Sequence, residues 1–342
     1  MLFMVVSLSM QASMPAEAVA LGFVETSRIV LVANGPDRTL QSFGVRDLGG
    51  EAIWTRAGTA HPSLIVANPN GSEFAVLDMI ENLVLRVRID GAVERIRVPE
   101  SPLDARFEGN ALYVLCRDAR RLLRIDGANR IEAETDIDPL LAASDSNSIL
   151  LYSRVTGSLR HYDARDLVLG RDSTQAAFAV DAEASEGELF LTFPQLAEVH
   201  VISRKTLSLI ERIKVGAVPT DTVIESSTTL LRTGLLNTAD PSSKRTWETE
   251  QSQSTSRAFA QGFLQGFLGL GLIRPSSKDF PNGVDRIARG TAYDSSTGTL
   301  YRVTKKSVKR LSTGIPPRAW VSAQPGIIYW DPLTRSVKLD AR

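Results

Sequence analysis

The side chains best suited to catalysis or metal binding in this sequence are three histidines, and they are far apart. They are His61, His161 and His200, and no two have the HxH or HExxH spacing of a local zinc site. His161 lies in the run LRHY and His200 in EVHV, at corresponding positions of adjacent repeat units. We interpret both as ordinary strand histidines, with a shared position facing a central channel as the alternative.

Four aspartates recur at the ends of short strand-like runs: Asp90, Asp126, Asp163 and Asp340. A ring of carboxylates at these positions could hold a hard cation such as calcium. However, Asp after a strand commonly forms an Asx turn, and Arg88, Arg124 and Arg160 precede three of them by two or three positions. The sequence therefore favours turn-forming aspartates over metal ligands.

The only cysteine, Cys116, lies in the apolar run LYVLC, which indicates a core position. A single thiol excludes an internal disulfide and a Cys-based zinc site. The sequence also contains no GxSxG motif, no phosphate-binding glycine loop and no CxxCH haem motif. We predict no catalytic residue, no metal site and no cofactor, so a non-enzymatic protein is the favoured interpretation and an enzyme the alternative.

The charge balance of the chain argues against nucleic acid as a partner. Its 342 residues include 39 basic and 39 acidic side chains, so the formal net charge is zero. Nucleic-acid binding depends on a strong positive field, which this composition lacks. Apolar residues make up 43% of the chain, enough for a core. After the N-terminus, no stretch reaches the roughly 18 to 20 apolar residues of a membrane span.

Residues 1–20 resemble a secretory signal peptide. Leu2–Met10 is apolar, and either Ala16-Glu17-Ala18 or Ala18-Val19-Ala20 provides a small-x-small cleavage site. No Lys or Arg precedes the apolar part, and a translation start at Met14 is the alternative. The expected location is periplasmic or extracellular after export, or cytoplasmic if translation starts at Met14.

The elements that must position these residues are short strands in a repeated unit. The clearest unit, Glu188–Pro219, contains three apolar runs separated by turns: Leu189–Phe193, Val199–Ser203 and Leu209–Val215. Similar strand-like apolar runs, each of which opens a repeat unit, recur at Ile29–Val32, Phe74–Leu77, Leu112–Leu115, Ile149–Tyr152, Leu189–Thr192, Leu230–Thr233, Leu300–Val303 and Ile327–Trp330. From Phe74 to Leu230 the spacing is about 37 to 41 residues, which is typical of four-stranded propeller blades.

Strands of this kind cannot cover both faces of their own sheet, so the units must stack sideways into a closed ring. We therefore predict an all-β fold, a single β-propeller over residues 21–342. The spacing from Leu300 to Ile327 is too short for four strands, so we merge these two units. This gives seven four-stranded blades, with eight or six as alternatives. We expect Val19–Thr26 to complete the last blade beside Ile327–Asp340.

The repeat resembles that of YVTN-type β-propellers. The resemblance is carried by Leu189–Thr192, Val201-Ile202, Ile213–Gly216 and Pro219, and by Pro62 with Pro69–Val76. It covers residues 29–237 best, while the final units differ in length. The resemblance implies an exported bacterial or archaeal protein, and members of this family range from binding modules to a few enzymes. No active-site motif transfers.

Between Leu230 and Leu300 about 30 residues are extra, which predicts an insertion with an apolar helix at residues 240–282. Within it, Ala258–Ile273 has no charge and places large apolar residues on one helical face. Three interpretations compete: a helix that caps the channel or flank, a docking element for a partner protein, and a membrane-surface or re-entrant segment. The candidate partner-binding residues are Phe259, Phe263, Leu264, Phe267 and Leu268.

The favoured function is an exported, non-enzymatic binding or scaffold propeller that mediates protein–protein interaction. Its partner is an unknown protein, with a membrane-associated one as an option. The alternative is a propeller enzyme, such as a lactonase-like hydrolase or a quinoprotein-like oxidoreductase, with its site at the mouth of the channel. Fold alone does not decide between them, because propellers host many functions.

Overall fold

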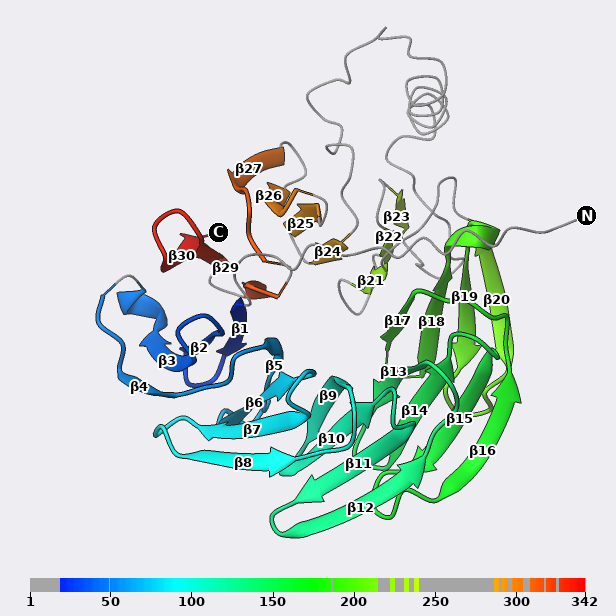
Figure 1. Cartoon of the computed structure of the whole chain (residues 1–342). Coiled ribbons are helices and arrows are strands. Elements are labelled where there is room, and N and C mark those ends of the chain that lie inside the picture. Colours follow the sequence, from blue (N-terminus) through cyan, green and yellow to red (C-terminus); the bar gives the residue numbers. More distant parts are fainter. Residues whose placement is uncertain are drawn as a thin grey trace, which may run out of the picture.

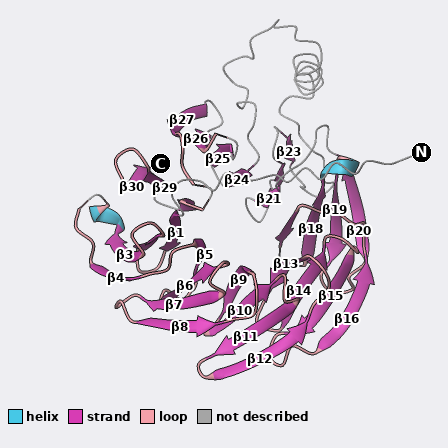
Figure 2. Cartoon of the chain, in the orientation of Figure 1, coloured by secondary structure: helices cyan, strands magenta, loops and turns pink. Residues whose placement is uncertain are grey.

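The structure is a computed structural model that describes residues 19–48, 50–185, 187–214, 222–224, 231–233, 237–239, 286–288, 291–294, 297–303, 308–316, 318–323 and 326–341. These residues form antiparallel sheets arranged around a ring, with only two short 3-10 helices, η1 (Val45–Asp47) and η2 (Pro194–Leu196) (Figures 1 and 2). The predicted insertion at residues 240–282 lies outside the described residues.

Six of the sheets have four strands, added in chain order. Sheet 1 contains β1 (Val19–Val24), β2 (Ile29–Asn34), β3 (Thr39–Gly44) and β4 (Trp54–Ala57), and sheet 2 contains β5 (Pro62–Ala67), β6 (Glu73–Asp78), β7 (Leu83–Arg88) and β8 (Val93–Arg97). Sheet 3 contains β9 (Pro102–Glu108), β10 (Ala111–Cys116), β11 (Arg121–Asp126) and β12 (Asn129–Glu134). Sheet 4 contains β13 (Pro139–Ser144), β14 (Ser148–Ser153), β15 (Ser158–Asp163) and β16 (Leu169–Thr174).

The second half of the ring contains four more sheets. Sheet 5 contains β17 (Asp181–Ala184), β18 (Glu188–Phe193), β19 (Glu198–Ser203) and β20 (Leu209–Lys214). Sheet 6 has three described strands, β21 (Thr222–Ile224), β22 (Leu231–Thr233) and β23 (Asn237–Ala239). Sheet 7 contains β24 (Arg286–Ala288), β25 (Thr291–Asp294), β26 (Thr299–Val303) and β27 (Val308–Ser312), and sheet 8 contains β28 (Trp320–Ala323), β29 (Gly326–Asp331) and β30 (Ser336–Ala341).

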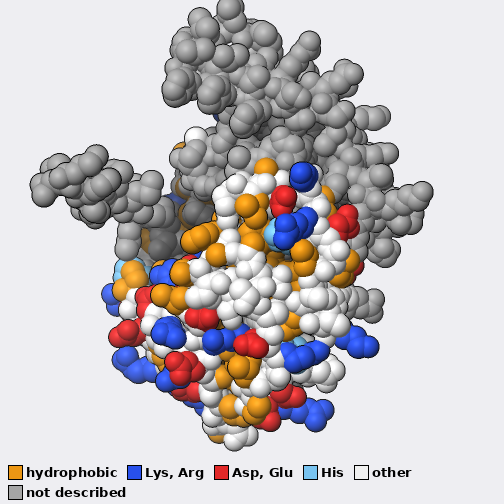
Figure 3. Space-filling view, turned by 90° about the vertical axis from the view of Figure 1, so that its right-hand side faces the viewer, with side chains coloured by type: hydrophobic (Ala, Val, Ile, Leu, Met, Phe, Trp, Pro, Cys, Tyr) orange, Lys and Arg blue, Asp and Glu red, His pale blue; other side chains and the backbone are white. Residues whose placement is uncertain are grey.

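The position of a strand within its sheet explains its composition. The second strands β6 and β10 are buried at every position, because neighbouring sheets cover both of their faces. The outer strands β8 and β16 have no buried position, because each lies at the rim with solvent beside it. The rim over β16 and β20 accordingly exposes charged and polar side chains mixed with apolar ones (Figure 3). The apolar runs recognised in the sequence are therefore mainly the second strands.

The hydrophobic core lies between the sheets rather than in one central cluster. One cluster joins sheets 4 and 5, through residues such as Leu150, Tyr152, Leu191 and Phe193. Further clusters join sheets 1 and 2, sheets 2 and 3, and sheets 3 and 4. Each sheet therefore buries its apolar faces by stacking sideways on its neighbours, as the repeat predicts.

Sheets 8 and 1 complete the ring. The innermost strands β1 and β28 contact one another, and the Leu21 N–H donates to the Arg318 carbonyl oxygen at 2.9 Å. A hydrophobic cluster also joins sheet 1, through Val30 and Val32, to Tyr329 and Trp330 of sheet 8. The ring is thus closed by packing between its first and last sheets.

The predicted role of Val19–Thr26 is wrong. This segment does not complete the last blade, because β1 pairs with β2 as the innermost strand of sheet 1. The physical reason is the four-residue turn between them, which keeps β1 next to the strand that follows it. Every complete sheet begins in the same way, with an inner strand that precedes the apolar run.

The merger of the last two units is also corrected. Leu300 lies in β26 and Ile327 in β29, which belong to two different sheets. The spacing is short because Leu300 lies in the third strand of sheet 7, whereas Ile327 lies in the second strand of sheet 8. The described residues therefore form eight sheets, a number within the predicted range of six to eight.

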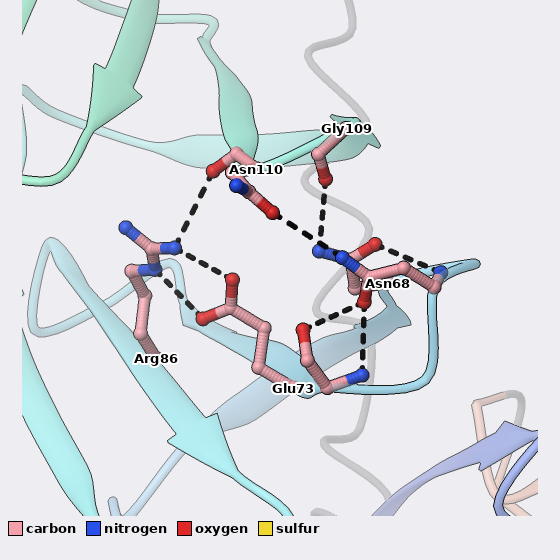
Figure 4. A network of polar contacts seen from close by, with 7 residues as sticks. Asn68, Glu73, Arg86, Gly109 and Asn110 are labelled. Atoms are coloured by element: carbon pink, nitrogen blue, oxygen red, sulfur yellow. Dashed lines mark hydrogen bonds and ion pairs between the residues drawn. The ribbon is translucent and has the colours of Figure 1, made fainter.

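A polar network fixes sheet 2 against sheet 3 (Figure 4). Arg86 binds Glu73 through two hydrogen bonds, of 2.9 Å from Nε and 2.6 Å from Nη2, and also donates to the Asn110 carbonyl oxygen. Asn68 Nδ2 donates to the Gly109 carbonyl oxygen at 3.0 Å. The ion pair is nearly enclosed, because the side chains of Arg86 and Glu73 are only 12% and 10% exposed.

Candidate functional site

The innermost strands surround a central cavity of about 1000 Å³ (Figure 1). Its wall comes from β1, β5, β9, β13, β17 and β28 and from loops at one end of the ring. This end, called here the channel-mouth face, carries the loops between second and third strands and the loops that join successive sheets. The antiparallel order of strands within each sheet places both kinds of loop on the same side. The cavity has the size and mixed lining of a ligand or anchor site.

Charged side chains enter the cavity from neighbouring sheets. Its lining includes Asp104 on β9 and Asp181 on β17, together with Arg117, Arg154 and Arg318. Burial raises the pKa of the Asp104 carboxyl group, while the nearby Arg106 and the Ala105 N–H oppose that rise. The Arg154 guanidinium pairs with Asp138 at 2.6 Å, and Arg117 pairs with Asp118 at 3.0 Å. Opposite charges are thus balanced around the cavity.

Five exposed apolar side chains lie beside the cavity on the channel-mouth face, and we call them the apolar patch. They are Ile137, Val155, Phe178, Val180 and Leu196, with exposures of 47%, 45%, 61%, 45% and 46%. Soluble proteins usually scatter such side chains singly, so a gathered group indicates an interaction surface. Val180 also lines the cavity, which makes the patch and the cavity continuous.

The loops that carry the apolar patch contact one another directly. The Phe178 N–H donates to the Arg154 carbonyl oxygen at 2.7 Å, and the Arg154 N–H donates to the Asp138 carbonyl oxygen at 3.1 Å. Gln195 Nε2 donates to the Ala177 and Phe178 carbonyl oxygens at 3.0 and 3.2 Å. These bonds link the loops in sequence, so the five apolar side chains belong to one surface.

The backbone of Phe178 adopts a left-handed conformation. Its φ is +68°, a region that bulky residues rarely adopt and that costs about 1 to 3 kcal/mol. Positive φ also occurs at buried turn residues such as Leu167 and Leu207. At Phe178 the aromatic ring is 61% exposed on the surface.

The structure places the four recurrent aspartates at turns or in ion pairs, away from the cavity lining. Asp90 accepts a hydrogen bond from the Ala92 N–H at 3.0 Å, and Asp163 accepts one from the Arg165 N–H at 2.7 Å. Asp126 pairs with Arg124, and Asp340 pairs with Arg302. Their interpretation as turn formers and charge partners is confirmed for these contacts. Within the described residues, no three His, Cys, Asp or Glu side chains are grouped to hold a metal.

The histidines do not share a position in the channel. His161 lies on β15 and His200 on β19, the third strands of their sheets, and neither lines the central cavity. Burial and the nearby Arg171 lower the pKa of His161, whose Nδ1 is buried and has no hydrogen-bond partner among the described residues. His200 is buried and its Nε2 is 2.9 Å from a Glu198 carboxylate oxygen. His61 precedes β5 and bonds Asp78 through its backbone N–H.

Cys116 occupies the core position that its apolar run indicates. It is fully buried at the end of β10, and burial raises the pKa of its thiol to about 12. The candidate partner-binding residues Phe259, Phe263, Leu264, Phe267 and Leu268 lie outside the described residues. Within the part of the chain that is described, no helix is long and apolar enough to cross a bilayer.

Comparison with known proteins supports the fold. No protein-family model and no curated protein matches the chain. A streptogramin B lyase structure is similar over 88% of this chain and 95% of its own, with a TM-score of 0.51 and 9% identity. A chain from a mitotic checkpoint complex is similar over 93% of this chain and 85% of its own, with a TM-score of 0.52 and 8% identity.

A catalytically inactive virginiamycin B lyase from Staphylococcus aureus, with quinupristin, is similar over 71% of this chain and 87% of its own. Its TM-score is 0.50 and its identity is 11%. This chain is a β-propeller. Because the identities are so low, these likenesses concern the fold alone, and the propellers in question include both an enzyme and a component of an assembly.

Sequence analysis missed the apolar patch. Its members lie in four different loops, and each loop contributes only one or two of the five. The signal that could have found Val155 is positional: Ile80, Val155 and Leu333 stand two residues after the end of a second strand and are all exposed. Apolar residues at such turn positions are candidates for a surface role.

Proposed function

We propose that this propeller is a non-enzymatic binding or scaffold protein that holds a protein partner on its channel-mouth face. The observation that carries this proposal is the apolar patch, formed by loops that contact one another beside the cavity. The charged side chains that border the patch, Arg154 and Asp138, already neutralise one another. The surface therefore suits a segment with uncharged aliphatic or aromatic side chains, one of which would enter the cavity as an anchor.

Site-specific photo-crosslinking tests this proposal. A photoreactive amino acid replaces Phe178 in the full chain, produced in its native cells, and Ile53 is replaced in a matched control. Ile53 is 60% exposed and lies in the loop between β3 and β4, at the opposite end of the ring. We expect one protein to be crosslinked from position 178 and not from position 53.

Surface variants complete the test. The double variant Phe178→Ser with Leu196→Ser removes apolar contacts, and Ile53→Ser with Val168→Ser is the matched pair on the opposite face. We expect the first pair to weaken binding of the crosslinked partner at least about tenfold and the second to leave it unchanged. Equal crosslinking from positions 178 and 53, or equal binding by both pairs, would contradict the proposal.

The finer parts of the proposal concern family and location. The YVTN-type resemblance is supported by β18 and β19, which contain Leu189–Thr192 and Val201-Ile202, and by β20, which contains Ile213 and Lys214. We also propose export to the periplasm or outside, with cleavage after Ala18. Cleavage after Ala20 would remove Val19 and Ala20, which are buried in β1 and paired with β2. N-terminal sequencing should find Val19 first, and an N-terminus at Met14 would contradict export.

One observation favours the enzyme alternative. Asp104 is a carboxyl group in the cavity with a raised pKa, a property that general acids share. If the cavity is a hydrolytic site, the purified chain should hydrolyse lactones, and Asp104→Asn should abolish that activity without affecting the apolar patch. If the purified chain hydrolyses no lactone in a panel of lactones, the lactonase-like hydrolase is excluded.

A further inference from the structure

A second pocket lies on the side of the ring, between sheets 4 and 5. It is a groove of about 580 Å³ that shares no lining residue with the central cavity. One wall comes from β16 and the two residues after it, and the other from β19, β20 and the loop between them. Its polar lining consists of Ser173, Thr174, Gln175, His200, Thr206, Ser208 and Arg212.

The imidazole of His200 is held firmly in this groove. The residue is only 3% exposed, and its ring lies 4.4 Å from the ring of Phe193, measured between centroids. Its Nε2 is 2.9 Å from the Glu198 carboxylate, which can only accept a hydrogen bond when ionised.

Arg212 brings a positive charge to the same place. It is the cross-strand partner of His200 in β20, so the two side chains lie on the same face of sheet 5. Arg212 is exposed and forms no ion pair or side-chain hydrogen bond with any described residue. Arg86, Arg124 and Arg154, in contrast, each have a carboxylate partner.

Other charged groups around the groove add to the positive field. Arg171 of β16 donates a hydrogen bond to the Lys205 carbonyl oxygen across the seam between the sheets. Lys214 lies opposite Glu198 in the pairing of β20 with β19. Arg212 and Lys214 thus lie on the face of sheet 5 that carries His200 and Glu198, whereas Glu211 pairs with Val201 on the other face. On this side of the molecule Lys and Arg side chains lie beside histidine side chains (Figure 3).

We infer that this groove binds a phosphate-type oxyanion, as free phosphate or as the phosphate group of a small molecule. Arg212 supplies the charge-assisted hydrogen bonds. Thr206 and Ser208 have hydroxyl oxygens 2.6 Å apart, and since one hydroxyl donates to the other, the second proton is free to donate to the anion. The His200 ring lines the groove beside these groups. This site is independent of the apolar patch, so either proposal can fail without the other.

The test is calorimetric titration of the full chain with inorganic phosphate and, separately, with methyl phosphate. We expect one binding site per chain. Arg212→Gln should weaken binding at least about tenfold. Lys214→Gln, the same exchange two residues along the same exposed strand, should change it less than about threefold.

Tight methyl phosphate binding would indicate the phosphate group of a larger molecule, and binding of inorganic phosphate alone would indicate the free anion. The inference is overturned if neither ligand binds, or if Arg212→Gln binds like the unaltered chain. Equal losses in Arg212→Gln and Lys214→Gln would also overturn it, because they would indicate nonspecific attraction to a positive surface.

Discussion

Replacement of Arg86 by Met should destabilise the propeller by about 3 kcal/mol. The change removes two hydrogen bonds to Glu73 and one to the Asn110 carbonyl oxygen of sheet 3. It leaves the Glu73 carboxylate without its cation at a site where the side chain is 10% exposed. Breaking a buried ion pair from one side costs about 3 to 5 kcal/mol, and the residual exposure of this pair places the effect at the lower end.

The matched control is Arg88→Met, two residues along the same strand. Arg88 pairs with Asp90 at the same 2.6 Å, but these side chains are 66% and 52% exposed. An exposed pair contributes about 0 to 1 kcal/mol, so Arg88→Met should change little. The free energy of unfolding, measured by urea titration with circular dichroism, compares the two variants directly.

A double-mutant cycle tests the reasoning further. Arg86→Met combined with Glu73→Leu removes both charges, so the pair should lose less stability than the sum of the single variants by at least about 2 kcal/mol. If Arg86→Met costs no more than Arg88→Met, or if the double variant is simply additive, enclosure of the pair between sheets 2 and 3 is not what makes it strong.

Three further perturbations test the described contacts. Burial raises the pKa of the Cys116 thiol to about 12, so the thiol stays protonated at every pH below that value. A thiol reagent at about pH 8 should therefore modify Cys116 only when the chain is unfolded in urea. Rapid modification of the native chain would show that β10 is not enclosed. Burial alone would raise the pKa of Asp145, but hydrogen bonds from Asn147 and Ser148 and the Arg204 guanidinium hold it below its ordinary 3.8. Its folded-state pKa is thus depressed, so its contribution to stability is present above about pH 4 and is lost as the pH falls through the folded value. The urea midpoint should therefore fall less steeply with acid in Asp145→Asn than in the unaltered chain. Parallel plots of urea midpoint against pH for the two proteins would count against the role of Asp145. Gly157→Ala should destabilise by at least about 1 kcal/mol, because φ is +72° and a Cβ would lie 2.3 Å from the Gln175 carbonyl oxygen; an unchanged melting temperature would show that this turn is not fixed.

The second strands could be predicted from the sequence because burial on both faces makes them continuously apolar. The predicted run Leu189–Phe193 falls within β18, observed as Glu188–Phe193. Their spacing then required sideways stacking, and the hydrophobic clusters between sheets confirm it. Inner and outer strands left weaker signals, since β17 is short and β16 is almost wholly exposed.

The grouping of strands into sheets was harder to derive than the strands themselves. The sequence shows which runs follow one another, but a strand between two apolar runs could pair with either. Val19–Thr26 was assigned to the last blade on this ground, whereas its short turn to Ile29 makes it the inner strand of sheet 1. The count was misled in the same way, because the apolar run at Leu300 is the third strand of sheet 7 and the run at Ile327 is the second strand of sheet 8.

The candidate sites depend on neighbours that only the ring brings together. Phe178 and Leu196 are separate loop residues in the sequence, and they share a surface because Gln195 bridges their loops. His200 and Arg212 meet through the register of β19 with β20. Neither arrangement is encoded by a local motif, so residue spacing alone could not have revealed them.

Closure of the ring by sheets 8 and 1 is the feature on which the cavity and its surrounding loops depend. Hydrogen exchange at the Leu21 amide tests it most directly, because this N–H points away from β2 and donates to the Arg318 carbonyl oxygen of sheet 8. In a closed ring the Leu21 amide should exchange as slowly as the central amides of β2. Fast exchange at Leu21 while β2 stays protected would mean that the first and last sheets do not meet.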